Sequence, residues 1–314
     1  MISTSLRRHA PLLLFAVCAG ALILVIEHQH YSANSALALE ILVTTVLAIV
    51  IMRNYAGPAI LSARLPKTAG VLTAVALALA LLAIVIVIII RTTVNAPPIL
   101  LFNGDGTSAN DVAAVERMLK DSHLDYSTVD TRQLNGMSQS QLEAYRLLIV
   151  PGGNFIEMGD GLTSRTTANI HNAVQRGMNY LGICAGAFLA ADGAYKSLNL
   201  TSGTRFGFYS AEKRGVRKAA VAISTVAMPV LDHYWEDGPQ LSGWGTVVGK
   251  YPDGTPAIVE GTSGKGWVIL SGVHAEAPEG WRRGMTFATP ASTDNAYART
   301  LIDAALHRKP LPHY

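Results

Sequence analysis

The chain has 314 residues, of which 50% are hydrophobic, and a formal net charge of +3. The charge divides unevenly, because residues 1–95 hold six basic and two acidic side chains and the remainder holds 19 basic and 20 acidic ones. Residues 96–314 therefore lack the positive excess of a nucleic-acid-binding domain, and we expect no nucleic-acid partner. This composition predicts two parts, a membrane segment at 1–95 and a globular domain at 96–314.

Three apolar runs occupy residues 10–26, 36–52 and 69–90. At about 1.5 Å per helical residue the third is roughly 33 Å long and the first two reach roughly 25 Å, so each is predicted to be a transmembrane helix. An alternative for the first run is a signal peptide, because two arginines precede it and residues 36–38 could form a cleavage site.

Basic residues set the expected orientation of these helices. Arginine or lysine precedes the first run and occurs between the second and third runs, whereas residues 27–35 contain neither. By the positive-inside rule the N-terminus is predicted to be cytoplasmic and the globular domain extracytoplasmic, anchored in the lipid bilayer of the cell membrane. Cleavage of a signal peptide would leave this prediction unchanged.

Strands and helices are expected to alternate from residue 97 to residue 193. Short apolar runs predict strands at 99–102, 126–129, 147–150 and 180–183. Helical spacing of apolar residues predicts helices at 110–120, 138–145 and 166–175. This order is typical of a parallel sheet covered on both faces, in which ligands bind at the carboxyl ends of the strands.

The pattern changes after Gly193. Strands with glycine-rich turns are expected at 205–209, 219–223, 256–260 and 266–270, followed by a closing helix at 294–306. Residues 234–238, Tyr-Trp-Glu-Asp-Gly, are expected to form a loop at a pocket mouth or an exposed rim.

The segment Gly-Ile-Cys-Ala-Gly (182–186) follows one of the predicted strands and precedes a run of small residues. Glycines on both sides of Cys184 suit a sharp strand-to-helix turn that exposes a nucleophile. The amides of Ala185 and Gly153 could then form an oxyanion hole. The alternative is a small buried cysteine, since Cys18 in the first apolar run is the only other cysteine and cannot pair with it.

A cysteine nucleophile also needs a base and an acceptor that orients the base. His274 and Glu276 follow the apolar run 267–271, and side chains two residues apart in an extended segment point the same way. The alternative is a loop histidine beside a solvated glutamate. Both segments lie at predicted strand ends, which favours the catalytic interpretation.

Five segments carry a resemblance to a known family: Asn-Gly-Asp-Gly-Thr-Ser (103–108), Val-Pro-Gly-Gly (150–153), Gly-Ile-Cys-Ala-Gly-Ala (182–187), Phe-Gly-Phe-Tyr (206–209) and Leu-Ser-Gly-Val-His-Ala-Glu (270–276). Over about residues 97–290 the chain resembles the class I glutamine amidotransferase-like superfamily, and within it the biotin-protein ligase N-terminal domain family. The resemblance implies a flavodoxin-like three-layer α/β/α fold and a triad of Cys184, His274 and Glu276. It also implies that the thiolate attacks a carboxamide carbon and the histidine passes a proton to ammonia.

Two positions depart from the family pattern. Glutamine-hydrolysing members commonly have glutamine where this chain has Phe188, and proline where it has Ala275. The first departure argues against free glutamine as substrate. We expect substrate contacts from the strand-end loops, at Asn103, Gly104, Asp105, Gly106, Thr107 and Gly152.

The leading hypothesis is a membrane-anchored cysteine hydrolase acting on a small amide, with no cofactor and no metal. His28 and His30 have no acidic or cysteine partner nearby in the sequence and do not predict a metal site. A second hypothesis is a ligand-binding or sensing module of the same fold that signals through the helices to a partner protein not identifiable from the sequence. A third is a domain without activity, with the function in the membrane segment.

Overall fold

The computed structural model describes residues 97–193, 196–227 and 229–314. The three predicted transmembrane helices and Cys18 lie outside these residues. Within the described part, no helix has both the length and the hydrophobicity needed to cross a bilayer.

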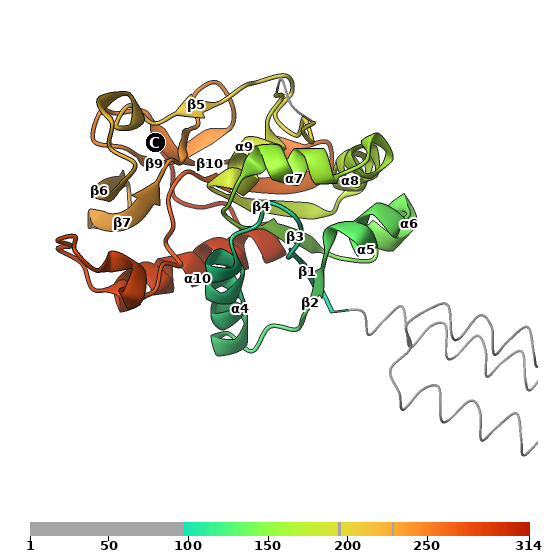
Figure 1. The fold of residues 1–314 in the computed structure, drawn as a ribbon, viewed down its shortest axis with the longest axis horizontal. Coiled ribbons are helices and arrows are strands. Elements are labelled where there is room, and N and C mark those ends of the chain that lie inside the picture. Colours follow the sequence, from blue (N-terminus) through green and yellow to red (C-terminus); the bar gives the residue numbers. More distant parts are fainter. Residues whose placement is uncertain (1–96, 194–195, 228) are drawn as a thin grey trace, which may run out of the picture. The chain divides into compact units, whose positions relative to one another are not determined.

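A nine-stranded sheet organises the described region, in the order β2-β1-β3-β4-β11-β10-β9-β6-β7 (Figure 1). Its parallel half consists of β2 (Tyr126–Val129), β1 (Ile99–Phe102), β3 (Leu147–Val150), β4 (Asn179–Ile183) and β11 (Gly266–Ser271). Its antiparallel half continues from β11 through β10 (Pro256–Ser263), β9 (Thr246–Lys250), β6 (Lys218–Thr225) and β7 (Leu231–Glu236). The expectation of a parallel sheet therefore holds for one half only.

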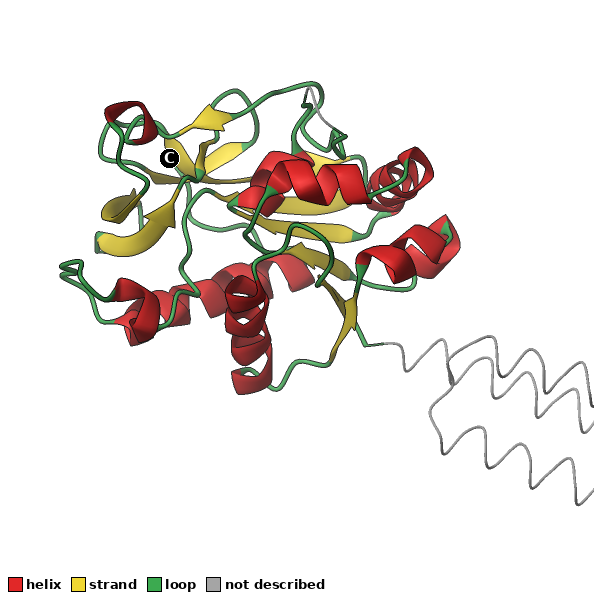
Figure 2. Ribbon diagram, viewed as in Figure 1, coloured by secondary structure: helices red, strands yellow, loops and turns green. Residues whose placement is uncertain are grey.

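Helices cover both faces of the parallel half, as Figure 2 shows. In chain order they are α4 (Ala109–Asp121), α5 (Thr131–Gly136), α6 (Gln139–Leu142), α7 (Phe155–Gly161), α8 (Ser164–Arg176), α9 (Ala185–Ala190) and α10 (Ala291–His307). Shorter elements are the ribbon β5 (Gly207–Phe208) with β8 (Pro239–Gln240) and the 3-10 turns η1 (Glu212–Arg214) and η2 (Glu279–Arg282).

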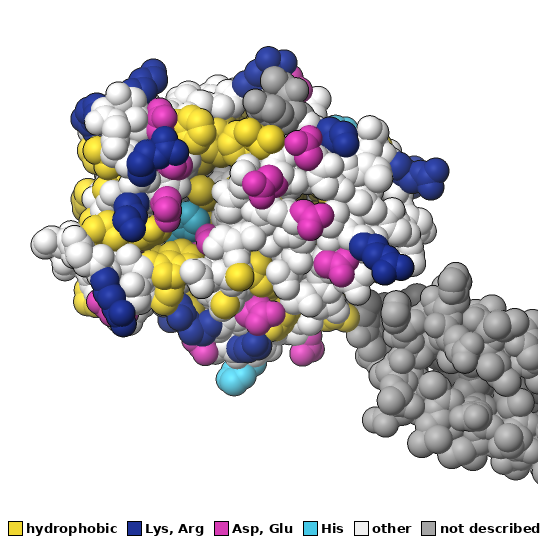
Figure 3. All heavy atoms as spheres, in the orientation of Figure 1, with side chains coloured by type: hydrophobic (Ala, Val, Ile, Leu, Met, Phe, Trp, Pro, Cys, Tyr) yellow, Lys and Arg dark blue, Asp and Glu magenta, His cyan; other side chains and the backbone are white. Residues whose placement is uncertain are grey.

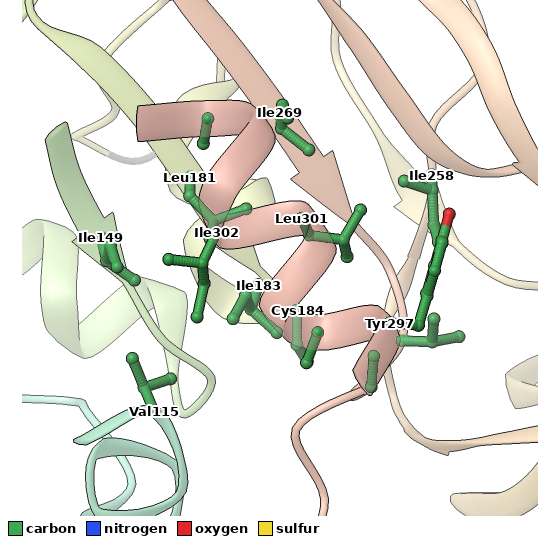
Figure 4. Packing of buried hydrophobic residues seen from close by; sticks show 14 of the residues in the cluster. Val115, Ile149, Leu181, Ile183, Cys184, Ile258, Ile269, Tyr297, Leu301 and Ile302 are labelled. Carbon is green, nitrogen blue, oxygen red and sulfur yellow. The ribbon is translucent and has the colours of Figure 1, made fainter. Parts of the chain in front are cut away.

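Alternating strand residues pack into two cores on opposite faces of the sheet. In β1, Ile99 and Leu101 join the core with α4 and α10, whereas Leu100 and Phe102 join the core with α5 to α9. This alternation follows from the two-residue period of a strand, and because both faces are covered the run is apolar throughout. Figure 4 shows Leu301 and Ile302 of α10 against Leu181 of β4. The predicted α/β/α layering is present.

The predicted strands at 99–102, 126–129 and 147–150 have the observed bounds, and the predicted closing helix lies within α10. Helices α5 and α7 and strands β7, β8 and β9 were not expected. The segment 234–238 was expected as a loop, but Tyr234, Trp235 and Glu236 belong to β7, which pairs with β6 over six residue pairs. Tyr234 and Trp235 are adjacent and both are buried. The segment therefore lacks the alternation of apolar and polar residues by which a strand is recognised from sequence.

Candidate active site

A pocket of about 790 Å³ opens beside the carboxyl ends of β4 and β11. Its lining includes Cys184 and His274 from the parallel half and Tyr234 and Glu236 from the antiparallel half. Figure 3 shows hydrophobic side chains gathered around a hollow on this face and charged side chains along its rim. The position agrees with the rule that α/β sheets bind ligands at strand carboxyl ends.

Cys184 occupies the sharp turn between β4 and α9. Its backbone angles, φ 50° and ψ −104°, are rarely adopted by residues other than glycine. A Cβ atom on Gly186 would lie 2.0 Å from the Val150 carbonyl oxygen, and one on Gly182 would lie 2.6 Å from the Gly186 carbonyl oxygen. Both glycines are therefore required for the chain to turn this tightly.

Cys184 lies at the pocket wall, and the residue as a whole is 6% exposed. Its Sγ donates to the backbone carbonyl of Glu236 at 3.4 Å, and its backbone N–H donates to the Ser271 carbonyl at 2.7 Å. The first contact orients the thiol towards β7, and the second links the turn to β11.

His274 lies beyond the end of β11, with its ring between two carboxylates. Its Nδ1 is 2.8 Å from Glu276 Oε1 and 3.0 Å from Asp111 Oδ1. All three residues are buried. Burial opposes the charged imidazolium, but Glu276 and Asp111 outweigh it and hold the pKa of His274 well above its ordinary value.

Asp111 was not predicted as a site residue. It lies in the first turn of α4, which Ser108 caps, and its own burial would raise the pKa of its carboxyl. His274 and Ser108 outweigh burial, so the pKa of Asp111 lies below its ordinary value. Asp is common in the first turn of any helix because of the helix dipole, so the sequence offered no signal that separated a catalytic role from a capping role.

Gly152 explains how Asp111 reaches the histidine. A Cβ atom at this position would lie 2.2 Å from Asp111 Oδ1 and 2.7 Å from His274 Cε1. Any side chain here would separate the carboxylate from the ring. Gly152 therefore contributes by leaving space between two other side chains.

Asp111, His274 and Glu276 also place possible metal-ligand atoms within 4.8 Å of one another. Two carboxylates and an imidazole form a donor set that divalent ions accept. Nδ1 is hydrogen-bonded to Glu276 Oε1, whereas Asp111 Oδ1 has no hydrogen-bond partner among the described residues and contacts the ring only as an ion pair.

The predicted oxyanion residues Gly153 and Ala185 both line the pocket with Cys184. The predicted substrate residues at 103–105 line a different hollow, beside Asp130 and Thr131. The backbone turns at Gly106, with φ 79°, between this hollow and the pocket that contains Cys184. Gly106 accepts from Asn154 N–H at 2.7 Å and Thr107 pairs with Gly153, so both support the Gly152-Gly153 loop.

Tyr234 of β7 forms part of the pocket wall facing His274. The two ring centroids are 5.8 Å apart with the rings nearly edge to face, and the Tyr234 hydroxyl donates to Glu236 at 2.5 Å. His274 N–H donates to the Tyr234 carbonyl at 2.8 Å. The antiparallel half thus fixes the backbone that carries the candidate base.

Sequence comparison identifies one family over part of the chain. The family described as "Biotin-protein ligase, N terminal" matches residues 97–217. This range contains Asp111 and Cys184 and ends before His274 and Glu276. An uncharacterized protein of Chlamydia muridarum (strain MoPn / Nigg) is 29% identical over 213 residues, which cover 58% of this chain and 82% of that protein.

Solved structures with a related arrangement include a glutamine amidotransferase from Thermotoga maritima. It has a TM-score of 0.44 and 14% identity, and the match covers 67% of this chain and 96% of that one. An exo-beta-1,4-mannosidase from Opitutaceae bacterium strain TAV5 also has a TM-score of 0.44 and 14% identity, over 68% of this chain and 37% of the mannosidase. By the family match alone, residues 97–217 of this mixed α/β chain are similar to the N-terminal region of biotin-protein ligases.

Proposed function

We propose that the protein is a cysteine amidohydrolase of the glutamine amidotransferase-like type, with Cys184 as nucleophile. The observation that carries the proposal is one pocket lined by both Cys184, in a strained turn, and His274, whose Nδ1 contacts buried carboxylates. Backbone strain concentrates at functional sites because it holds a reactive group in position.

The chemistry follows the charges of these residues. The Cys184 thiolate attacks the amide carbon, and the amides of Gly153 and Ala185 receive the charge that develops on oxygen. His274 gives its proton to the departing amine as the carbon–nitrogen bond breaks, leaving a thioester. Water then attacks the thioester and gives a proton to His274, the carbon–sulfur bond breaks, and the acid leaves while the Cys184 thiolate and the His274 imidazolium are restored.

Glu276 and Asp111 would fix the orientation of His274 and stabilise its charged form. Glu276 is the orienting member in the triad inferred from the sequence, and Asp111 adds a second carboxylate from α4. A small amide is the proposed substrate, and no cofactor is needed for these steps.

Anchoring of the domain by residues 1–95, with the pocket outside the cytoplasmic membrane, is also a proposal. Its basis is the distribution of apolar and basic residues in the sequence. A compartment-specific reporter joined to the C-terminus tests it, and a cytoplasmic signal would overturn it.

Iodoacetamide labelling of the full chain tests the enzymatic proposal. We expect Cys184 to be alkylated in the folded chain, and Cys184→Ala to abolish turnover of every amide that the wild type accepts. Labelling that begins only on unfolding, or turnover that survives Cys184→Ala, would refute the proposal.

A ligand-binding module is the second candidate. It is favoured by the contact of the Cys184 thiol with the Glu236 carbonyl, which occupies the sulfur as a hydrogen-bond donor, and by Phe188 in place of glutamine. Tight binding of an amide that the protein leaves intact over hours would support this candidate over the enzyme.

A further inference from the structure

Three phenylalanine rings form one wall of the pocket that contains Cys184. Phe155 begins α7, Phe188 lies four residues after the cysteine in α9, and Phe208 is in β5. The ring centroids of Phe155 and Phe188 are 4.5 Å apart and those of Phe188 and Phe208 are 5.0 Å apart. We call these residues the phenylalanine wall. It begins one helical turn from the candidate nucleophile.

The wall is exposed to solvent mainly at Phe208, whereas Phe155 is half-buried and Phe188 is buried. Phe208 is 39% exposed, and its strand is held in place by pairing with β8 through Pro239. Exposed aromatic surface at a concave site commonly marks contact with an apolar ligand group. Glutamine has no flat apolar group that could use this wall.

Two cations line the same pocket without a carboxylate partner among the described residues. Lys218 begins β6, and Arg283 follows η2. The neighbouring Arg217, by contrast, pairs with Asp237 and Glu212. Glu236 is the remaining unpaired acid on this side and accepts a hydrogen bond from Tyr234. Apart from His274 the lining holds three basic and three acidic side chains, and Lys218 and Arg283 are the two cations in it that remain available to an anionic ligand group.

The pocket volume also fits a larger substrate than a free amino-acid amide. At about 790 Å³ the pocket lies in the upper part of the range for ligand sites, roughly 300–1,000 Å³. Free glutamine would leave most of this space and the exposed ring of Phe208 in contact with water.

We propose that the substrate is an amide bearing an aromatic group, which packs on the phenylalanine wall, and an acidic group, which meets Lys218 and Arg283. N-acylated aromatic amino acids with a free carboxylate belong to this class, and free glutamine does not. This inference rests on the proposed function, because it takes Cys184 as the group that attacks the amide carbon.

Alkylation of Cys184 in the full chain by four chloroacetamides tests the inference. The probes are chloroacetamide, N-benzylchloroacetamide, N-chloroacetyl-phenylalanine and N-chloroacetyl-glutamine. In each case a carbon–sulfur bond forms at the thiolate and chloride leaves. The rate for the peptide containing Cys184 is measured by mass spectrometry and divided by the rate for free cysteine.

The normalised rate is expected to be about tenfold higher for N-benzylchloroacetamide than for chloroacetamide, from contact between aromatic rings. N-chloroacetyl-phenylalanine is expected to be fastest, and N-chloroacetyl-glutamine to be several-fold slower than it. The advantage of the carboxylate should shrink as salt rises, because salt screens exposed charges.

Substitutions test which side chains cause the aromatic preference and which cause the carboxylate preference. Phe208→Ala and the conservative Phe188→Leu should reduce the aromatic preference, and Lys218→Gln with Arg283→Gln should reduce the carboxylate preference. Phe287→Leu and Lys213→Gln serve as matched controls, since both residues lie outside the pocket lining. Both controls should keep the wild-type order.

The two proposals fail in different ways. If native Cys184 reacts with all four probes in proportion to free cysteine, the substrate inference is overturned and the reactive cysteine stands. If native Cys184 reacts with none of them until the chain unfolds, the proposed function is overturned and the substrate inference with it.

Discussion

The parallel and antiparallel halves of the sheet contribute different things to one pocket. Cys184 and His274 follow β4 and β11, adjacent parallel strands in which Ile183 is in register with Ser271. Tyr234, Glu236 and Lys218 come from β6 and β7 of the antiparallel half. Parallel neighbours end at the same edge, so the candidate reactive groups meet there by topology alone.

The antiparallel half faces these groups from the other side of the pocket. Its β7 gives backbone contacts to both candidate catalytic residues, at the Cys184 thiol and the His274 N–H. We infer that the parallel half supplies the reactive groups, whereas the antiparallel half orients these groups and contributes to the choice of substrate. The following predictions test this inference.

The largest effect is expected from His274→Gln in the parallel half. Loss of the general acid and base should reduce kcat/KM for an accepted aromatic amide by about 10²- to 10⁴-fold. His307→Gln, at the exposed end of α10, is the matched control and should retain wild-type kinetics. An equal loss of kcat/KM in the two variants would contradict the role of His274 as general acid and base.

Gly186→Ala should disrupt the parallel half through its backbone. The added Cβ would lie 2.0 Å from the Val150 carbonyl oxygen, so we expect the free energy of unfolding to fall by about 3 kcal/mol. Denaturant unfolding measures the change. Gly136→Ala is the control, because a Cβ there meets no atom within 4 Å, and its stability should be unchanged or slightly higher.

Acid stability should depend on a buried pair where β7 meets α10. Burial lowers the pKa of His233 to about 3 and raises the pKa of Asp294 to about 6. The histidine contribution to stability is present above its unfolded pKa of about 6.5 and is lost as pH falls towards 3. The aspartate contribution is present below its unfolded pKa of about 3.9 and is lost as pH rises through 6. Between pH 6 and 4 the two therefore offset each other.

Asp294→Asn removes that compensation. Relative to wild type, its free energy of unfolding should fall by a further 2–3 kcal/mol, roughly, between pH 6 and pH 4. His233→Phe should do the reverse and gain stability on acidification over the same interval. Urea unfolding at the two pH values measures both. If the free energy of unfolding changed by the same amount between the two pH values in all three proteins, the assigned pKa directions would be contradicted.

The smallest effect is expected from Asp111→Asn, which keeps the shape of the side chain and removes its charge. The pKa of His274 should fall because one of its two carboxylate partners is neutralised, and kcat/KM should decrease about ten- to a hundredfold. NMR titration of labelled histidine follows the pKa, with the signal assigned by its loss in His274→Gln. Asp121→Asn, at the other end of α4, controls for helix stability and should leave the titration unchanged.

The parallel half was largely predictable from the sequence. Strands β1 and β3 are apolar at every position because both faces are covered, and Pro-Gly-Gly after β3 and Gly-x-Cys-x-Gly at the end of β4 mark where those strands end. The antiparallel half was less predictable, since β7 contains Asp232, His233 and Glu236 among its six residues and its pairing depends on distant segments. Helix α7 was missed because it contains two glycines and relies on Asn154 as its cap.

The candidate site was predictable where sequence neighbours determine geometry. His274 and Glu276 are two residues apart and their side chains touch, as the spacing indicated. Asp111 and the phenylalanine wall could not be found this way, because their residues meet only through the packing of α4, α7, α9 and β5. Residues 103–105 were expected at the site because they end a strand, but they line a different hollow before the turn at Gly106.

The positive φ angle of Cys184 has a consequence for selection on this gene. A left-handed backbone costs about 1–2 kcal/mol for a residue with a side chain, so replacing the cysteine by glycine would relieve strain while removing the thiol. A chain that had lost its nucleophile would then accumulate in the cell at least as well as the original. Selection for a high level of folded protein would therefore not keep cysteine at this position. A screen for well-expressed variants would enrich variants that lack the nucleophile.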